Sequence, residues 1–218
     1  MSRARLLDYD TSVFINCPFD AEYQQLFEAL VFAVYECGFI ARSARESRDA
    51  SQVRIDKIFR IIAECRYGIH DISRTELDTT SQLPRFNMPL ELGMFLGAKY
   101  YGNKTQREKV CLVLDREKYR YQKFCSDIGG QDIDAHSGDV QVAVTIVRDF
   151  LQCARSGSER LIPSGSMVFE RYQSFLQDLP ALCDSLNLHR QELIFSDYVT
   201  LCVEWLRAHP QLASLPAT

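Results

Sequence analysis

Short apolar runs alternate with amphipathic segments along the first 154 residues of the chain. Four runs have the length and composition of buried strands, and they lie within 11–20, 39–44, 67–73 and 109–115. Four other segments space their apolar residues as helices do, at 21–38, 52–66, 87–102 and 138–154. Because the strand candidates are continuous apolar runs, they indicate a parallel sheet with helices on both faces. We therefore expect an α/β domain with the flavodoxin-like strand order.

The residues after 154 predict a linker followed by helices. The segment 155–166 is rich in Ser, Gly and Pro, which is typical of a linker. A helix should begin at Met167 and stop at Pro180, a brief one should follow, and a long amphipathic helix should cover 190–208. The expected domains are the α/β domain at 1–154, this linker, and a C-terminal helical region at 167–218. That region is expected to pack on the domain, pair with another subunit or dock a protein partner.

Composition and charge narrow the classes of partner. The net charge of −4 and the isoelectric point of about 5.6 provide no overall basic field, which argues against nucleic acid. No apolar run approaches the roughly 20 residues of a membrane span, and the N-terminus lacks the apolar stretch of a signal peptide. The eight cysteines are scattered and none forms a C-x-x-C pair. This pattern predicts reduced thiols in a cytoplasmic protein.

Candidate chemistry follows from the position of each strand end. Ligands of open parallel α/β sheets bind beyond the carboxyl ends of the strands. That rule selects the turn after the first strand (Asn16, Cys17, Pro18, Phe19 and Asp20), the loop 42–49, the end of the third strand (His70, Asp71, Ser73 and Arg74), and Asp115 with the loop after it. The polar loop 74–86 is long enough to serve as a lid over this edge.

The carboxylate of Glu91 is the main candidate for a reactive group. Pro89 suits the first position of a helix, which would place Glu91 in the first turn. There the helix dipole stabilises a negative charge by ~0.3–1 kcal/mol and would keep Glu91 ionised. An ionised carboxylate can attack an anomeric carbon or stabilise a ribosyl oxocarbenium ion. The alternative is a helix-start carboxylate with no chemical role.

The other charged candidates also have two interpretations each. Asp71 ends a buried strand, where a free carboxylate is costly, so it either serves a site or caps the next turn with Arg74 as its partner. His70 is either a substrate contact or a strand histidine with its hydrogen bonds satisfied. The loop after the second strand carries three arginines that either hold phosphate or form a solvated charged surface, namely Arg42, Arg45 and Arg48. The basic and aromatic stretch 115–124 either stacks on a nucleotide or forms an exposed turn.

Motifs for several common sites are missing from the sequence. It contains no G-x-x-x-x-G-K-[ST], G-x-G-x-x-G, H-E-x-x-H or G-x-S-x-G pattern. The acidic stretch 126–139 does not match a calcium-binding loop and is expected to form a glycine-rich turn. We expect neither a metal nor a cofactor, with NAD or a nucleotide entering only as a substrate.

Three features together resemble the nucleoside 2-deoxyribosyltransferase-like superfamily and its TIR-like relatives. They are the N-C-P-F-D turn at 16–20, the strand that ends in Asp71, and the E-L-G-x-x-x-G-A helix from Glu91 to Ala98. The resemblance covers about 11–154 and does not extend to the C-terminal helices. It implies a flavodoxin-like fold and cleavage or transfer at an N-glycosidic bond. By the same resemblance Glu91 is the nucleophile, Asp71 orients the nucleoside, and the opening turn lines the pocket, with Asn87 and Met88 also assigned to substrate binding.

The resemblance also implies a biological setting. TIR-like relatives cleave NAD and often act as toxic effectors in bacterial antiviral defence, and members of both groups commonly act as oligomers. The leading hypothesis is therefore an N-glycosidase or (deoxy)ribosyl transferase acting on a nucleotide, nucleoside or NAD, assembled as a homo-oligomer. The alternative hypotheses are a non-catalytic nucleotide-sensing or protein-interaction module, and a scaffold whose only function is assembly.

Overall fold

Five parallel strands form one sheet in the order β2-β1-β3-β4-β5. The computed structural model describes residues 9–77, 82–155 and 161–211. The strands are β1 (Ser12–Asn16), β2 (Ile40–Arg42), β3 (Tyr67–Asp71), β4 (Val110–Asp115) and β5 (Ile133–Ala135). This is the flavodoxin-like order, so the predicted α/β fold is confirmed. The chain turns from one side of β1 to the other between β2 and β3, which places the usual ligand crevice between the ends of β1 and β3.

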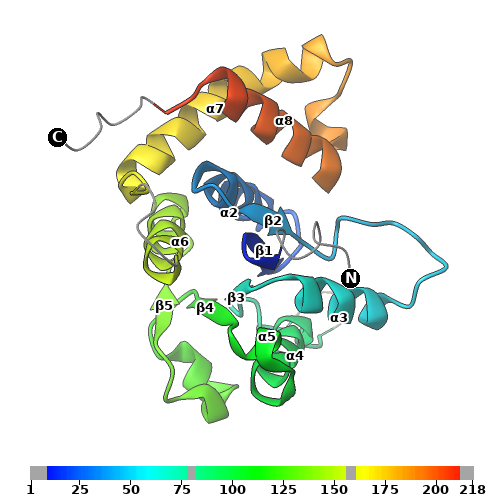
Figure 1. Ribbon diagram of the computed structural model, residues 1–218, viewed down its shortest axis with the longest axis vertical. Coiled ribbons are helices and arrows are strands. Elements are labelled where there is room, and N and C mark those ends of the chain that lie inside the picture. The colour runs from blue at the N-terminus through cyan, green and yellow to red at the C-terminus, as the bar shows by residue number, and fades with distance from the viewer. Residues whose placement is uncertain (1–8, 78–81, 156–160, 212–218) are drawn as a thin grey trace.

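Helices cover both faces of this sheet (Figure 1). They are α2 (Gln24–Glu36), α3 (Arg54–Glu64), α4 (Asn87–Tyr101), the short α5 (Lys104–Arg107) and α6 (Val140–Ala154). Strand β1 is buried on both sides, and its alternating side chains belong to different cores. Val13 and Ile15 pack with α2 and α6, whereas Phe14 packs with α3 and α4. This two-sided burial explains why the strand is a continuous apolar run.

Two further helices, α7 (Gly165–Ser185) and α8 (Phe195–Ala208), form a layer outside α2 (Figure 1). Helix α2 lies between the sheet and this layer, which is why it is buried on nearly every side. The ring of Phe32 stacks on Phe175 with 5.2 Å between centroids and lies 5.8 Å from Trp205. The C-terminal helices therefore share one hydrophobic core with the sheet.

Several helix boundaries differ from the expected ones. The helix expected over 190–208 begins only at Phe195, after a 3-10 turn at Arg190–Glu192, and the brief helix expected after Pro180 is part of α7. Helix α4 begins at Asn87, so Pro89 occupies its third position and Glu91 lies in its second turn. Proline is tolerated there because the first four N–H groups of a helix have no partner within the helix. Helix α7 does not stop at Pro180 but continues to Ser185. Buried Leu179 and Cys183 hold this part of the helix in the core, and packing outweighs the hydrogen bond that proline removes.

The stretch 126–139, expected to be a loop, contains one short 3-10 turn (Ser126–Ile128) and the edge strand β5. An edge strand of three residues needs few apolar positions, so its pattern is too weak to stand out. Two shorter elements, α5 and a 3-10 turn at Arg120–Lys123, were not expected either.

In α3 the buried side chains include Ile58, Ile61 and Ile62, while Phe59 is half exposed. Every cysteine is free, as expected for reduced thiols. None of the helices in the described part of the chain combines the length and hydrophobicity of a membrane-spanning segment. The expected linker 155–166 lies partly outside the described residues, as does the loop 74–86.

Candidate functional site

Three of the candidate residues meet at the crevice between β1 and β3. The Nδ2 atom of Asn16 donates to the carbonyl oxygen of Met88 at 2.9 Å and lies 3.0 Å from Nδ1 of His70. All three residues are buried. Burial and the nearby charge of Lys109 lower the pKa of His70 to about 3, so this imidazole is neutral at physiological pH. The cluster ties the first turn of α4 to the strand ends, and it positions the helix that carries Glu91.

Glu91 lies on the face of α4 that packs against the sheet. The other buried residues of this helix are Met88, Leu92 and Phe95, which share the same face by helical spacing. Glu91 itself is only 5% exposed. Among the described residues, its carboxylate has neither a hydrogen-bond donor nor an ion-pair partner in the structure. Its oxygen atoms are not among the fully enclosed polar atoms that lack a partner, so they keep some contact with solvent, although burial of the group still penalises its charge.

The protonation of Glu91 follows from this burial. Burial raises the pKa of Glu91 from its ordinary value of 4.5 to about 7, and the charge of Arg54 opposes the rise. The expectation that the helix dipole keeps Glu91 ionised is therefore wrong. The dipole acts mainly within the first turn, whereas Glu91 occupies the second turn and faces the core.

Cys17 is buried in the turn that follows β1. Its thiol has its pKa raised well above the ordinary value by burial first and then by the fields of Asp71 and Glu91. The charge of Arg45 opposes this rise and lowers the pKa of the same thiol. The charges of Asp71, Glu91 and Arg45 therefore all act on the buried turn after β1, at the edge of the sheet where ligands of this fold bind. The thiol itself stays protonated and unreactive.

Asp71 is fully buried and is held by several donors. Its Oδ2 atom accepts from the hydroxyl of Tyr23 and lies 2.9 Å from Nε2 of His136. Its Oδ1 atom accepts from the backbone N–H of Ser73 at 2.8 Å. The Nδ1 atom of His136 accepts from the N–H of Gly138 at 2.9 Å, which leaves Nε2 as the protonated nitrogen facing Asp71. The expected alternative, an ion pair with Arg74, does not form, because Arg74 binds Asp20 and Glu22.

Two adjoining cavities open above Asp71. One of about 180 Å³ is lined by Tyr23, His136 and Arg116 among other residues. The other, of about 340 Å³, is lined by Asp20, Arg85 and Leu77 among others. Glu22 and Arg74 line both cavities, so the two are neighbours at the carboxyl edge of the sheet.

The salt bridge between Arg74 and Asp20 shapes the wall that separates these cavities. Burial acts to raise the pKa of Asp20, but hydrogen bonds from Arg74 and from the N–H of Tyr23 outweigh it and hold that pKa below its ordinary value. Glu91 is not among the residues that line either cavity.

The stretch 115–124 fastens the loop after β4 to the loop after β3. Asp115 accepts from Nε and Nη2 of Arg120 at 2.9 and 2.6 Å. The same guanidinium donates to the carbonyl oxygen of Ser73 at 2.7 Å and to Oε1 of Glu76 at 3.2 Å. Arg120 is thus committed to the protein and is not available to neutralise a nucleotide.

The three arginines of the loop after β2 have different environments. Arg42 donates to Glu46 at 2.7 Å and to Glu64 at 3.0 Å, so its charge is neutralised within the protein. Arg45 and Arg48 line a third cavity, of about 190 Å³. Arg42 therefore has a structural role, whereas Arg45 and Arg48 are placed to meet a ligand.

The remaining candidates, Pro18, Phe19 and Asn87, line none of the three cavities described above. Pro18 is buried, and the ring of Phe19 lies 5.5 Å from the guanidinium of Arg45. Asn87 is exposed at the start of α4, one residue before buried Met88.

Sequence reasoning missed four residues that the fold brings to this edge, namely Tyr23, Arg54, Lys57 and His136. Tyr23 and His136 are far from Asp71 in the sequence, and only the sheet order places them beside it. Arg54 and Lys57 lie one turn apart on α3 and face the loop after β2. Their helical spacing was a signal for a shared face, but nothing in the sequence indicated which face.

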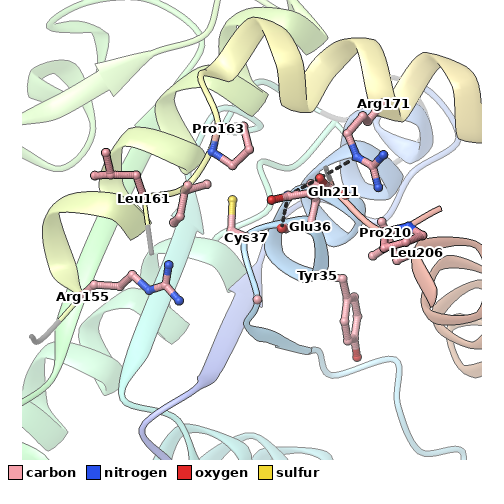
Figure 2. A pocket seen from close by; sticks show the side chains of 12 residues that line it. Tyr35, Glu36, Cys37, Arg155, Leu161, Pro163, Arg171, Leu206, Pro210 and Gln211 are labelled. Atoms are coloured by element: carbon pink, nitrogen blue, oxygen red, sulfur yellow. Dashed lines mark hydrogen bonds and ion pairs between the residues drawn. The ribbon is translucent and has the colours of Figure 1, made fainter. Parts of the chain in front are cut away.

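A separate cavity of about 330 Å³ lies at the opposite, amino-terminal edge of the sheet (Figure 2). Buried Glu36 accepts there from Arg171 at 2.6 Å and from Gln211 at 2.5 Å, which fastens α7 and the end of the chain's described part to α2. Because its polar groups pair with each other, we interpret this hollow as a junction between helices.

The comparisons with known proteins add no further assignment. A search against protein-family models, curated proteins and solved structures found no match to this chain. Among the described residues, no group of three or more histidine, cysteine, aspartate or glutamate side chains has the arrangement of a metal site.

Proposed function

We propose that this protein cleaves or transfers at the N-glycosidic bond of a nucleotide, nucleoside or NAD, as members of the nucleoside 2-deoxyribosyltransferase-like superfamily and their TIR-like relatives do. The observation that carries the proposal is Glu91. It is a buried carboxylate without a hydrogen-bond partner among the described residues, next to the switch point of a flavodoxin-like sheet. Strongly shifted pKa values in such positions are typical of functional groups.

The chemistry assigns one role to each group. In its ionised form Glu91 attacks or stabilises C1′ of the sugar as the glycosidic bond breaks, and the leaving group departs with the bonding electron pair. A nucleobase takes up a proton as it leaves, whereas the nicotinamide of NAD leaves as a neutral molecule. Water or an acceptor nucleoside then completes the substitution at C1′. Asp71 is fully buried and orients the substrate through Tyr23 and His136, which line the adjoining cavity.

A second function is favoured by a different observation. Glu91 lies outside the two cavities above Asp71. A ligand that occupied these cavities without reaching Glu91 would suit a nucleotide-sensing module, whose C-terminal helices would pass the signal to a partner protein.

The two functions are separated by measuring binding and cleavage in parallel. Thermal shift against NAD, ATP, deoxynucleosides and their monophosphates identifies the ligand, and chromatography of the same mixtures measures free base or nicotinamide. Release of base or nicotinamide above the uncatalysed rate supports the enzyme. A stabilising ligand that stays intact in every mixture overturns the enzyme and supports the sensor.

A further inference from the structure

The cavity beside the loop after β2 is lined by cations and by no carboxylate. It has a volume of about 190 Å³ and is formed by that loop, by the start of α3 and by the start of α8. Its charged lining residues are Arg45, Arg48, Arg54 and Lys57, and its apolar wall is Ile194 and Phe195. Among the residues that the structure describes, none of the four cations forms an ion pair.

Nearby acids do not balance this charge. Glu46 is bound to Arg42, and Asp49 accepts from the backbone and the hydroxyl of Ser51. Four like charges around one hollow repel each other, so the arrangement favours an anion that enters the hollow. The chain as a whole carries a net charge of −4, which makes this cationic concentration local rather than general.

Two of the cations are held in place before any ligand binds. The guanidinium of Arg45 donates to Gln24 at 3.0 Å and lies 5.6 Å from the ring centroid of Phe27. The ammonium of Lys57 donates to the carbonyl oxygen of Ser47 at 2.8 Å. Cations fixed in this way lose less conformational freedom on binding an anion. Helix α3, with 11 residues, begins at Arg54 without a side-chain cap, and its N-terminus adds to the positive field.

The size and position of the cavity identify the group that fits it. A volume of 190 Å³ holds about six water molecules at roughly 30 Å³ each, which is below the ~300 Å³ at which ligand pockets usually begin. It therefore suits one group of a ligand rather than a whole nucleotide. Helix α3, which supplies Arg54 and Lys57 to the cavity, packs against α4, the helix that carries Glu91. The charge of Arg54 also lowers the pKa of Glu91, so the field of the cavity reaches this carboxyl group.

We propose that this cavity binds the phosphate of a nucleotide whose glycosidic bond lies at Glu91. The inference rests on the proposed function and narrows its substrate class to phosphorylated compounds, excluding free nucleosides. Because the start of α8 forms one wall, the C-terminal helices complete the substrate site. Arg45 and Lys57 hold the anion from the bottom of the site, while exposed Arg48 and Arg54 close on it.

Isothermal titration calorimetry with inorganic phosphate, deoxyadenosine 5′-monophosphate and deoxyadenosine tests the proposal. The pocket variant is Arg48→Gln with Arg54→Gln, both exposed and therefore compatible with folding. The control is Arg107→Gln with Arg207→Gln, which removes the same charge from exposed sites on α5 and α8. Wild type and control should bind phosphate, and the pocket variant should bind it at least about tenfold more weakly, because it loses two charge-assisted contacts.

Three outcomes would overturn the assignment. In the first, the pocket variant and the control bind phosphate equally well. In the second, neither the nucleotide nor NAD displaces bound phosphate. In the third, the wild type binds deoxyadenosine as tightly as deoxyadenosine 5′-monophosphate. Binding is measured here without reference to cleavage. A protein that binds phosphate as expected but releases no base therefore contradicts the proposed function and leaves the phosphate site intact.

Discussion

The carboxyl group of Glu91 can carry a charge, but the residue is only 5% exposed. This burial controls the protonation of the carboxyl group and therefore its chemistry. With a pKa of about 7 it is partly protonated at neutral pH. In the proposed reaction, attack on C1′ needs the ionised form, and the positive charge that develops at C1′ in the transition state would stabilise this carboxylate. The cations of the adjacent cavity contribute in the same direction, as Arg54 does already.

Replacing Glu91 by glutamine should change how stability depends on pH. Because the folded-state pKa is raised, its contribution to stability is complete below pH 4.5 and is lost as pH rises through about 7. A pKa change from 4.5 to about 7 corresponds to roughly 3 kcal/mol. Glu91→Gln should therefore gain up to roughly 3 kcal/mol relative to wild type between pH 4.5 and pH 8, measured by urea unfolding.

The matched control is Glu117→Gln, at an exposed position after β4. It should follow the wild type across the same pH range. If the difference between Glu91→Gln and wild type is the same at both ends of the range, the carboxyl does not titrate as its burial requires.

The sequence predicts where a single residue lies in the fold only if its position relative to a strand end is sufficient to place it. The rule for strand ends located Asn16, Asp71 and Arg45 correctly at the carboxyl edge of the sheet. It could not reveal that His136 approaches Asp71, because that contact depends on an edge strand that the pattern does not show. Nor could it distinguish Arg42 from Arg45, since only the folded loop decides which arginine meets a carboxylate.

The helices and strands were predictable where burial imposes a strong pattern. The four central strands and the helices around them follow from continuous apolar runs and 3.6-residue spacing. The weakest predictions lie at β5 and at Pro180, where local rules and tertiary packing disagree. Helix α7 continues past its proline because Leu179 and Cys183 anchor that turn in the core.

Helix α7 should therefore become more stable when its proline is removed. Pro180 is exposed, so Pro180→Ala changes little packing. The substitution restores a backbone N–H that can donate within the helix and should raise the free energy of unfolding by roughly 1–3 kcal/mol. Part of this gain is offset because proline also restricts the unfolded chain. The shift is measured as an increase in the urea midpoint.

Gln177→Ala, at an exposed position of the same helix, is the control and should shift the urea midpoint far less. A lower midpoint for Pro180→Ala would show instead that a bend at this proline is needed to seat the helix.

At the scale of the whole molecule, the layers explain how distant segments build one site. The sheet order places β1 beside β3, and α4 carries Glu91 to their shared crevice. The C-terminal helices, which the family resemblance leaves unexplained, pack on α2 and bring the start of α8 to the cationic cavity. Removing either layer would disturb both the core and the site.

The most direct measurement of the central claim is the rate of base or nicotinamide release by purified wild type, Glu91→Gln and Glu117→Gln, each checked for native circular dichroism. The substrates are NAD and a panel of nucleotides and deoxynucleosides. The account predicts release by wild type and by Glu117→Gln, and a loss of at least about 100-fold in Glu91→Gln, equivalent to ~2.7 kcal/mol of transition-state stabilisation. Wild-type turnover in Glu91→Gln would contradict it.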